Sequence, residues 1–354
     1  MTAYVPILKA KKGETDALRN LTIPPVQMRP LLEVTPQEPK EKDTADDVAA
    51  KFTARVTKFA KALRDDVPAE VVCAIDTALV DGADYAEQVW QPIIEVLTEQ
   101  LIPRAVRPVV RLTDSPGRLA QARAVISAFE DGGCLRLEPV TRPLSVDEAT
   151  TALEGLLSAL GQVPQCMDLV IDLWAISDDD DAQRACTAAL AWLSWTDLNP
   201  WRSVAVASSA FPKDLTGVPL DTVTPLLRRD ADLWRQVRQH PDGQPVDFGD
   251  YAIAHPLLGK GFRGYPNLRY TTGTRWQVWR RRTPEHLGNH RFCLICQSVL
   301  ASEHWTGEAC WGDAQIALRA EECSSPGSTT DWRAFGTSRH LAVVTDRLAR
   351  LGEP

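Results

Sequence analysis

The stretch Met167-Asp-Leu-Val-Ile-Asp-Leu-Trp174 is short and almost entirely apolar, and it carries a carboxylate, Asp172, near its end. Apolar runs of this length, rich in β-branched residues, are typical of strands buried on both faces of a parallel sheet. Similar runs recur along the chain. They predict strands at residues 4–10, 29–34, 70–78, 105–112, 134–139, 167–174, 203–209 and 246–253.

Helical periodicity lies between most of these runs. Residues 43–64, for example, carry apolar side chains at spacings of three and four. Further helices are predicted at 83–102, 116–129, 145–160, 178–195 and 220–240. Ser145 with Glu148 forms a capping-box pattern, and the four aspartates at 178–181 favour a helix start over a metal site.

Repeated alternation of strand and helix implies right-handed crossovers and a closed (β/α)8 TIM-like barrel, which we expect to occupy residues 1–256. An open doubly wound sheet is the alternative. It lacks support because no Gly-x-Gly-x-x-Gly motif joins a predicted strand to a predicted helix, and the chain has no Walker-type loop.

The pattern changes in residues 257–354. Thr272-Gly273 lies between alternating segments and predicts a hairpin, and helices are predicted at 284–301, 312–322 and 330–351. No linker rich in Pro, Gly or Ser divides this region from the rest. We therefore interpret it as a C-terminal elaboration packed on the barrel and not as an independent domain.

The composition is that of an ordinary globular protein, with 44% hydrophobic and 24% charged residues. A net charge of −8 argues against a general binder of nucleic acid or of membrane surfaces. No apolar run approaches the roughly 18 residues of a membrane helix. The first nine residues are typical of a strand and not of a signal peptide, so we expect a cytoplasmic location.

Four cysteines lie in or beside apolar runs: Cys73, Cys134, Cys166 and Cys186. Because a buried free cysteine behaves as a small hydrophobe, we expect these thiols to be free and structural.

In a barrel of this kind the functional site lies at the C-terminal ends of the strands. The polar residues expected there are Lys9, Lys11, Glu33, Asp76, Arg111, Arg136, Glu138, Asp172, Ser208, Ser209, Asp250 and Tyr251. Two interpretations stay open: a ring of mutually paired ions that closes the barrel, or a polar pocket for a ligand. In the second, we expect Glu33, Asp76 and Asp172 to be catalytic. The expected ligand-binding residues are Lys9, Lys11, Arg111, Arg136, Ser208, Asp250 and Tyr251.

All six histidines come after the seventh predicted strand. This excludes a zinc hydrolase built on histidines of the first seven strands, and a phosphodiesterase that needs a first-strand histidine. Acid–base chemistry would then fall to carboxylates or a lysine. Three carboxylates could also hold Mg²⁺, and the lysines and arginines could hold a phosphate or a carboxylate.

Two further motifs have a structural interpretation that we favour. Cys293-Leu-Ile-Cys296 resembles half a zinc site, but Cys310 and Cys323 have the wrong spacing for the other half. His290 and His304 could substitute for them. Because Cys293 and Cys296 also fit one face of an apolar helix, we do not expect zinc. Arg275-Trp-Gln-Val-Trp-Arg-Arg-Arg282 could contact nucleic acid. We favour a strand whose tryptophans point inward and whose arginines pair with acids.

Several stretches resemble the beta protein family of bacteria and phages. They are Tyr4-Val-Pro-Ile-Leu-Lys-Ala-Lys-Lys-Gly-Glu14, Arg29-Pro-Leu-Leu-Glu33, Asp247-Phe-Gly-Asp-Tyr251, Arg269-Tyr-Thr271, Thr306-Gly307, Gly312-Asp313 and the stretch from Trp332 to His340. The resemblance spans most of the chain and implies no particular reaction. The occurrence of the family beside mobile elements implies a role in phage–host conflict. Family members often have two adjacent histidines where this chain has Arg339-His340.

Two functions therefore compete. The first is a barrel hydrolase or lyase that acts on a small anionic ligand, phosphorylated or nucleotide-like, with carboxylates as acid–base groups and with or without Mg²⁺. The second is a non-catalytic recognition or immunity module that contacts a partner through Arg280, Arg281, Arg282 and exposed tryptophans. A protein partner fits the second function better than a nucleic acid, and we expect no membrane association.

Overall fold

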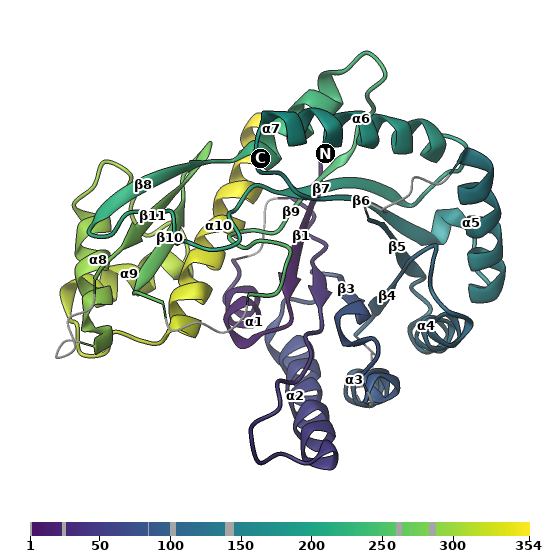
Figure 1. Cartoon of the computed structure of the whole chain (residues 1–354), viewed down its shortest axis with the longest axis horizontal. Coiled ribbons are helices and arrows are strands. Elements are labelled where there is room, and N and C mark those ends of the chain that lie inside the picture. The colour runs from purple at the N-terminus through teal and green to yellow at the C-terminus, as the bar shows by residue number, and fades with distance from the viewer. Residues whose placement is uncertain are drawn as a thin grey trace.

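The predicted barrel is present: eight parallel strands close on themselves in the computed structural model (Figure 1). The structure describes residues 2–22, 26–83, 85–99, 104–138, 145–259, 264–282 and 288–354. Neighbours in the barrel follow the order of the chain, and the last strand pairs with the first. The strands are β1 (Tyr4–Lys9), β2 (Leu31–Glu33), β3 (Cys73–Asp76), β4 (Val106–Val110), β5 (Gly133–Leu137), β6 (Met167–Ala175), β7 (Ser203–Ser209) and β9 (Asp247–Asp250).

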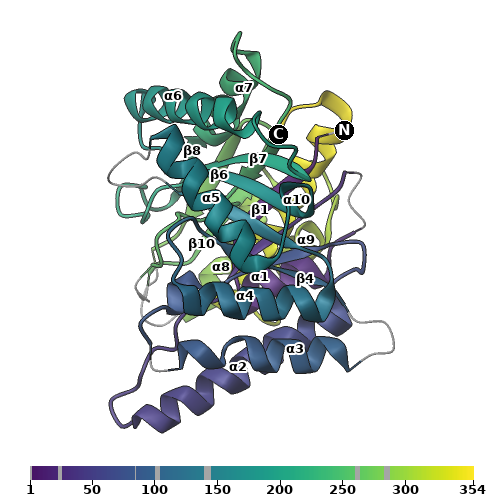
Figure 2. The same ribbon diagram turned by 90° about the vertical axis from the view of Figure 1, so that its right-hand side faces the viewer.

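Helices cover the outside of the barrel, and Figure 2 shows α3, α4, α5 and α6 ranged along it. Their bounds are α1 (Lys12–Arg19), α2 (Ala45–Asp66), α3 (Trp90–Thr98), α4 (Pro116–Phe129), α5 (Val146–Leu160), α6 (Asp179–Thr196) and α7 (Arg229–Gln239). The capping box at Ser145 is confirmed, and the Asp178 side chain caps α6 by accepting from the Asp181 amide. The sequence did not predict α1, which is short and rich in charged residues.

The prediction of one helix over 220–240 is wrong in its first part. Residues Thr222–Leu227 form a strand, β8, and only Arg229–Gln239 is helical. The stretch contains β-branched residues followed by Pro225, which disfavour a helix interior. What decides the strand is a partner: β8 pairs antiparallel with β11 in a second sheet.

That second sheet has three strands in the order β10–β11–β8, where β10 is Asn267–Thr271 and β11 is Arg275–Arg280. The hairpin predicted at Thr272-Gly273 joins β10 to β11 and is confirmed. Three helices follow: α8 (Arg291–Leu300), α9 (Trp311–Glu321) and α10 (Thr329–Leu351). Figure 1 shows this second unit beside the barrel. Predicted residues 284–287 lie outside the described residues.

Helix α10 belongs to two hydrophobic cores. Trp332 and Phe335 in its first part pack with Leu268 and Phe292 of the second unit. Leu341, Val344 and Leu348 in its second part join the core between the barrel strands and their helices. There α10 packs beside α1 and against β1. The boundary at residue 256/257 stays a prediction, since β8 precedes it in the chain and yet joins the second sheet.

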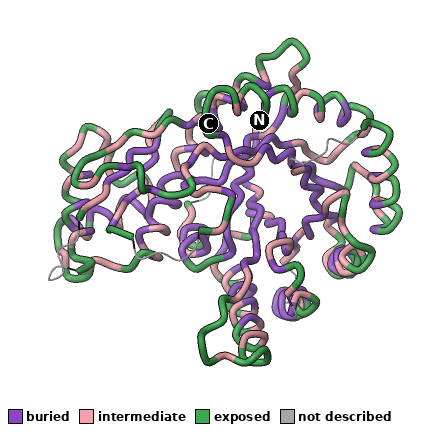
Figure 3. Tube along the Cα trace, in the orientation of Figure 1, coloured by how far each residue is buried: buried purple, intermediate pink, exposed green. Residues whose placement is uncertain are grey.

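Alternating side chains divide the strands between two environments. In β1, Tyr4 and Leu8 face the surrounding helices, while Val5 and Ile7 point into the barrel with Leu31. Both faces are thus buried, as the purple strands of Figure 3 show, which explains the nearly continuous apolar runs in the sequence. At the C-terminal end of each apolar run, the last side chain that points inward lies at the mouth of the barrel.

The cysteines differ in part from expectation. Cys73, Cys134 and Cys186 are buried free thiols as predicted, but Cys166 is exposed because it lies in a 3-10 turn before β6. Cys293 and Cys323 form a disulfide that joins α8 to the segment after α9. Cys293 is therefore not available as half of a zinc site.

Two sequence predictions on surface chemistry can also be checked. None of the helices in the described parts of the chain combines the length and the apolar character that a membrane span requires. Trp276 and Trp279 are buried, so the inward tryptophans of β11 are confirmed. Among the described residues, Arg280 and Arg281 have partners other than the expected acids: Arg280 donates to the backbone carbonyls of Leu215 and Val218, and Arg281 donates to the Ser298 hydroxyl.

Candidate functional site

Six successive barrel strands carry an ionisable residue two positions beyond an apolar residue of the barrel interior. The pairs are Ile7 and Lys9, Leu31 and Glu33, Ala74 and Asp76, Val109 and Arg111, Cys134 and Arg136, and Val170 and Asp172. Since side chains two apart on a strand point to the same face, all six charged side chains point into the mouth of the barrel. Strand register places Lys9 beside Glu33 and Glu33 beside Asp76.

Arg136 lies at the centre of this charged cluster and is about 1% exposed. Its Nη1 donates to Glu33 Oε1 at 3.0 Å and to Asp76 Oδ2 at 2.6 Å. Its Nε and Nη2 donate to Asp172 Oδ2 at 3.0 and 2.6 Å. The three carboxylates predicted to be catalytic are therefore brought together by the positive charge of one guanidinium.

Arg111 forms a second, outer layer of the same cluster. One edge of its guanidinium holds Asp76, with Nη1 to Oδ1 at 3.0 Å and Nη2 to Oδ2 at 2.7 Å. The other edge holds Glu138, with Nε to Oε2 and Nη2 to Oε1 both at 2.9 Å. Such paired, charge-assisted bonds fix both distance and orientation.

Lys9 and Tyr251 close the side of the cluster nearest to β1 and β9. Lys9 forms an ion pair with Glu33 and donates to the Pro256 carbonyl at 2.7 Å. The Tyr251 hydroxyl donates to Asp172 and accepts from Arg136 Nη2 at 2.6 Å. Both cations lie about 6 Å from the centre of the Tyr251 ring, at 5.8 Å for Lys9 and 6.0 Å for Arg136. Both cations are thus within the range of a cation–π contact with the Tyr251 ring.

A distortion of β6 adds an aromatic residue to the mouth. The strand shifts register between Asp172 and Ala175, and Trp174 adopts a left-handed backbone conformation with φ +64°. Its amide donates to Asp172 Oδ1 at 3.0 Å, and its half-buried ring meets Tyr251 edge to face. Non-glycine residues in this conformation are strained and often lie at functional sites.

The electrostatics of the cluster favour fixed protonation states. Burial alone would raise the pKa of Asp76, but Arg111 and Arg136 outweigh burial and hold that pKa well below its usual range. Burial raises the pKa of the Tyr251 hydroxyl, and the nearby Asp172 and Glu33 raise it further, against the opposing charge of Arg136. At neutral pH Asp76 is therefore ionised and Tyr251 protonated.

Three of the predicted ligand-binding residues lie apart from this cluster. Ser208 and Asp250 are Cα partners on β7 and β9, one residue out of phase with the inward Ser209 and Tyr251. Asp250 faces outward, where it accepts from the Tyr4 hydroxyl at 2.7 Å and lies 2.8 Å from His340 Nε2. The Lys11 side chain is exposed at the start of α1.

The carboxylates do not fit the Mg²⁺ site that the sequence allowed. Arg136 occupies the place between Glu33, Asp76 and Asp172 that a cation shared by all three would need. In the part of the chain that the structure describes, no group of three or more His, Cys, Asp or Glu residues could hold a metal ion.

Two residues near the mouth were not predicted as part of the site. One is Trp174, although it ends the run that predicted the fold. The other is His255, which follows β9 and is half-buried. Burial lowers the pKa of its imidazole, and the charges of Lys213 and Lys9 lower it further. Its position after the eighth strand was a usable signal, because only the first seven strands had been excluded as sources of histidine.

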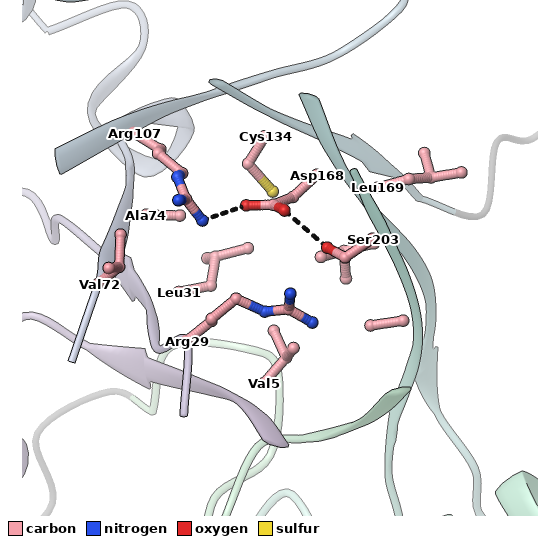
Figure 4. Close-up of a pocket in the computed structure, with 12 residues that line it drawn as sticks. Val5, Arg29, Leu31, Val72, Ala74, Arg107, Cys134, Asp168, Leu169 and Ser203 are labelled. Atoms are coloured by element: carbon pink, nitrogen blue, oxygen red, sulfur yellow. Dashed lines mark hydrogen bonds and ion pairs between the residues drawn. The ribbon is translucent and has the colours of Figure 1, made fainter. Parts of the chain in front are cut away.

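A second charged layer lies at the opposite, N-terminal end of the barrel, where it lines a small cavity (Figure 4). Arg107 donates to Asp168 at 2.7 Å, and the Ser203 hydroxyl donates to the same carboxylate at 2.6 Å. Arg29 points into this cavity and forms an ion pair with Asp247. This end of such barrels serves stability, so we do not assign the functional site to it.

The fold and this cluster define a (β/α)8-barrel protein with a buried ionic network at the C-terminal ends of its strands. The beta protein family model matches residues 4–346, nearly the whole chain, and the protein belongs to this family. No curated protein matches the chain. Among solved structures, a 3-hexulose-6-phosphate synthase is similar over 59% of this chain and 90% of its own, with 13% identity and a TM-score of 0.29.

Proposed function

We propose that the protein binds a small anionic ligand, phosphorylated or nucleotide-like, at the C-terminal mouth of the barrel. The observation that carries the proposal is the convergence of Lys9, Arg111 and Arg136 from three strands at the end where barrel proteins bind their ligands. Guanidinium groups match the geometry of phosphate and carboxylate oxygens. We propose that this binding takes place in the cytoplasm, as the strand-like N-terminal residues indicate, and in phage–host conflict, as the family resemblance implies.

Access to the cations differs along the cluster and supports Arg111 as the first contact. The Arg136 side chain is fully buried, whereas that of Arg111 is 13% exposed beside Glu138, which is 28% exposed. Burial lowers the pKa of Arg111, but Asp76 and Glu138 more than compensate and raise it. The arginine therefore keeps its charge at every relevant pH and can attract an anion.

The carboxylates divide between positioning and chemistry. A carboxyl group whose pKa is far below neutral is a poor proton acceptor, and it carries no proton to donate. Asp76 is therefore best suited to hold Arg111 and Arg136 in place. If the bound anion is a substrate, we assign proton transfer to Glu33 and Asp172, the other two carboxylates that contact Arg136.

The proposal is tested by titrating the purified protein with inorganic phosphate and with a nucleoside monophosphate in a calorimeter. We expect binding to the wild type and a loss of about tenfold or more in affinity for Arg111→Gln, the effect of one lost charge-assisted contact. Arg123→Gln on the exposed face of α4 serves as the charge-matched control. A wild type that binds neither anion, or an Arg111→Gln variant that binds equally well, contradicts the proposal.

The second candidate is a recognition or immunity module without a small-molecule site. It is favoured by the mutual pairing of the cluster, in which Glu33, Asp76 and Asp172 are almost fully buried on Arg136. The tryptophans expected in its contact surface, all of which the structure describes, are buried or half-buried, so the exposed Arg282 is the better candidate for that contact. A phage-resistance phenotype that survives in a stably folded Arg111→Gln variant would favour this candidate.

A further inference from the structure

Glu138 differs from the other carboxylates of the charged cluster. It lies one residue beyond β5, and its side chain is 28% exposed, compared with 3% for Glu33, 1% for Asp76 and 0% for Asp172. Burial raises its pKa, but the bonds from Arg111 and the charges of Arg136 and Arg111 outweigh this and lower the pKa. It is an ionised group at the border between the cluster and solvent.

The contacts of Glu138 are those that an anion would make. Its two oxygens accept from the Nε and Nη2 edge of Arg111, both at 2.9 Å, and Oε1 lies 3.2 Å from Arg136 Nε. Asp76 holds the opposite edge of Arg111 from inside the barrel. The guanidinium is therefore anchored by Asp76 even when Glu138 moves away, and the edge left free lies on the more exposed side.

The charge balance points the same way. The cluster combines three cations, Lys9, Arg111 and Arg136, with four carboxylates, Glu33, Asp76, Glu138 and Asp172. With Glu138 turned to solvent, three charges of each sign remain, and an incoming anion with one charge restores the present balance. Glu138 is already partly solvated and becomes fully hydrated when it turns outward, which offsets the loss of its arginine contacts. A fully buried carboxylate has no such path to solvent, and its departure would leave its partners uncompensated inside the protein.

We infer that Glu138 is an internal competitor of the ligand, whose carboxylate occupies the position on Arg111 and Arg136 that the anionic group of a ligand takes. The inference rests on the proposed function and adds a ligand class: a group that presents two oxygens in one plane, as a carboxylate or a phosphoryl group does. Glu138 turns outward when such a group enters. It thereby sets a threshold against weakly binding anions.

The inference is tested with Glu138→Gln, which keeps the size of the side chain but removes its charge and one acceptor oxygen. Acetate and inorganic phosphate serve as probes, so that the carboxylate and the phosphoryl group are measured separately. By calorimetry we expect at least one of them to bind Glu138→Gln about tenfold or more tightly than the wild type, the affinity equivalent of one charge-assisted bond that no longer has to be displaced. Glu154→Gln, an exposed position on α5, should bind like the wild type.

A second variant guards against an effect on folding. Glu138→Ala leaves the position empty, so acetate should raise its melting temperature more than that of the wild type by filling the gap. Adding Arg111→Gln to either variant should abolish the gain in affinity. If the wild type binds phosphate through Arg111 while Glu138→Gln binds no more tightly, the inference fails and the proposed function stands. If neither the wild type nor any Glu138 variant binds an anion, both fail.

Discussion

Arg136 is buried among three acids, and its burial has a consequence for each of them. Removing one partner from a buried charged network leaves the others with uncompensated charge and is far more costly than losing a pair at the surface. Asp76 is held by two arginines, since it accepts from both Arg136 and Arg111, and it also accepts from the Ala78 amide.

We therefore expect Asp76→Asn to destabilise the fold by about 3–5 kcal/mol, the range for breaking a buried pair. Urea denaturation of both proteins measures it. Asp81→Asn is the matched control, since Asp81 pairs with Arg118 with a half-exposed carboxylate, and it should change stability by less than about 1 kcal/mol. Equal effects at the two positions would contradict a network centred on Arg136.

The same residue predicts a pH dependence. The pKa of Asp76 is lower in the folded than in the unfolded state, so its contribution to stability is complete above the usual carboxyl pKa and is lost as pH falls below about 4. Unfolding free energies measured from pH 7 down to pH 3 should therefore fall more steeply for the wild type than for Asp76→Asn. Parallel curves would show that Asp76 does not titrate with folding.

At the residue scale, strand ends and alternation were enough to find most of the cluster. They predict Lys9, Glu33, Asp76, Arg111, Arg136 and Asp172, because an apolar run ends where the barrel mouth begins. Ser208 and Asp250 were predicted together with their neighbours Ser209 and Tyr251, but two adjacent residues of a strand cannot both point inward. The sequence does not say which of two adjacent residues in β7 and in β9 points into the barrel. The register of the two strands shows it.

Elements were predicted well where their own sequence decides them. Helix α4 has its predicted bounds, with Ser115 as N-cap and Pro116 at its first position. Strand β8 could not be predicted, because its conformation depends on pairing with β11, which lies about fifty residues further along the chain.

The C-terminal ends of α4 and α5 allow backbone strain to be tested by two substitutions with opposite expected effects on stability. Both helices end in a left-handed residue, which is Glu130 in α4 and Gly161 in α5. Glu130→Gly should stabilise the protein by about 1 kcal/mol, and Gly161→Ala should destabilise it by a similar amount. Gly161 has no neighbour within 4 Å of an added Cβ, so the second effect is conformational. Thermal denaturation measures both, and changes of the same sign would contradict this account.

On the scale of the whole molecule, the disulfide between Cys293 and Cys323 constrains only the second unit. It closes a loop with a sequence separation of 30 residues, for which chain entropy predicts about 3–4 kcal/mol of stabilisation. Protein purified without reductant and then denatured should show six reactive thiols, the number of free cysteines. A count of eight would mean that the pair is reduced in solution. Reduction should lower the melting temperature, whereas Cys166→Ser, at an exposed free thiol, should not.

Helix α10 has a consequence for the order of events during synthesis. The helix that packs beside α1 and β1 comes from residues Thr329–Leu351, although β1 precedes all the other strands of the barrel. The ribosome must therefore synthesise the whole second unit before the layer of helices around the barrel is complete. Until then Tyr4 and its neighbours lack their last covering helix, and a nascent chain stalled before residue 329 would present that uncovered strip to chaperones.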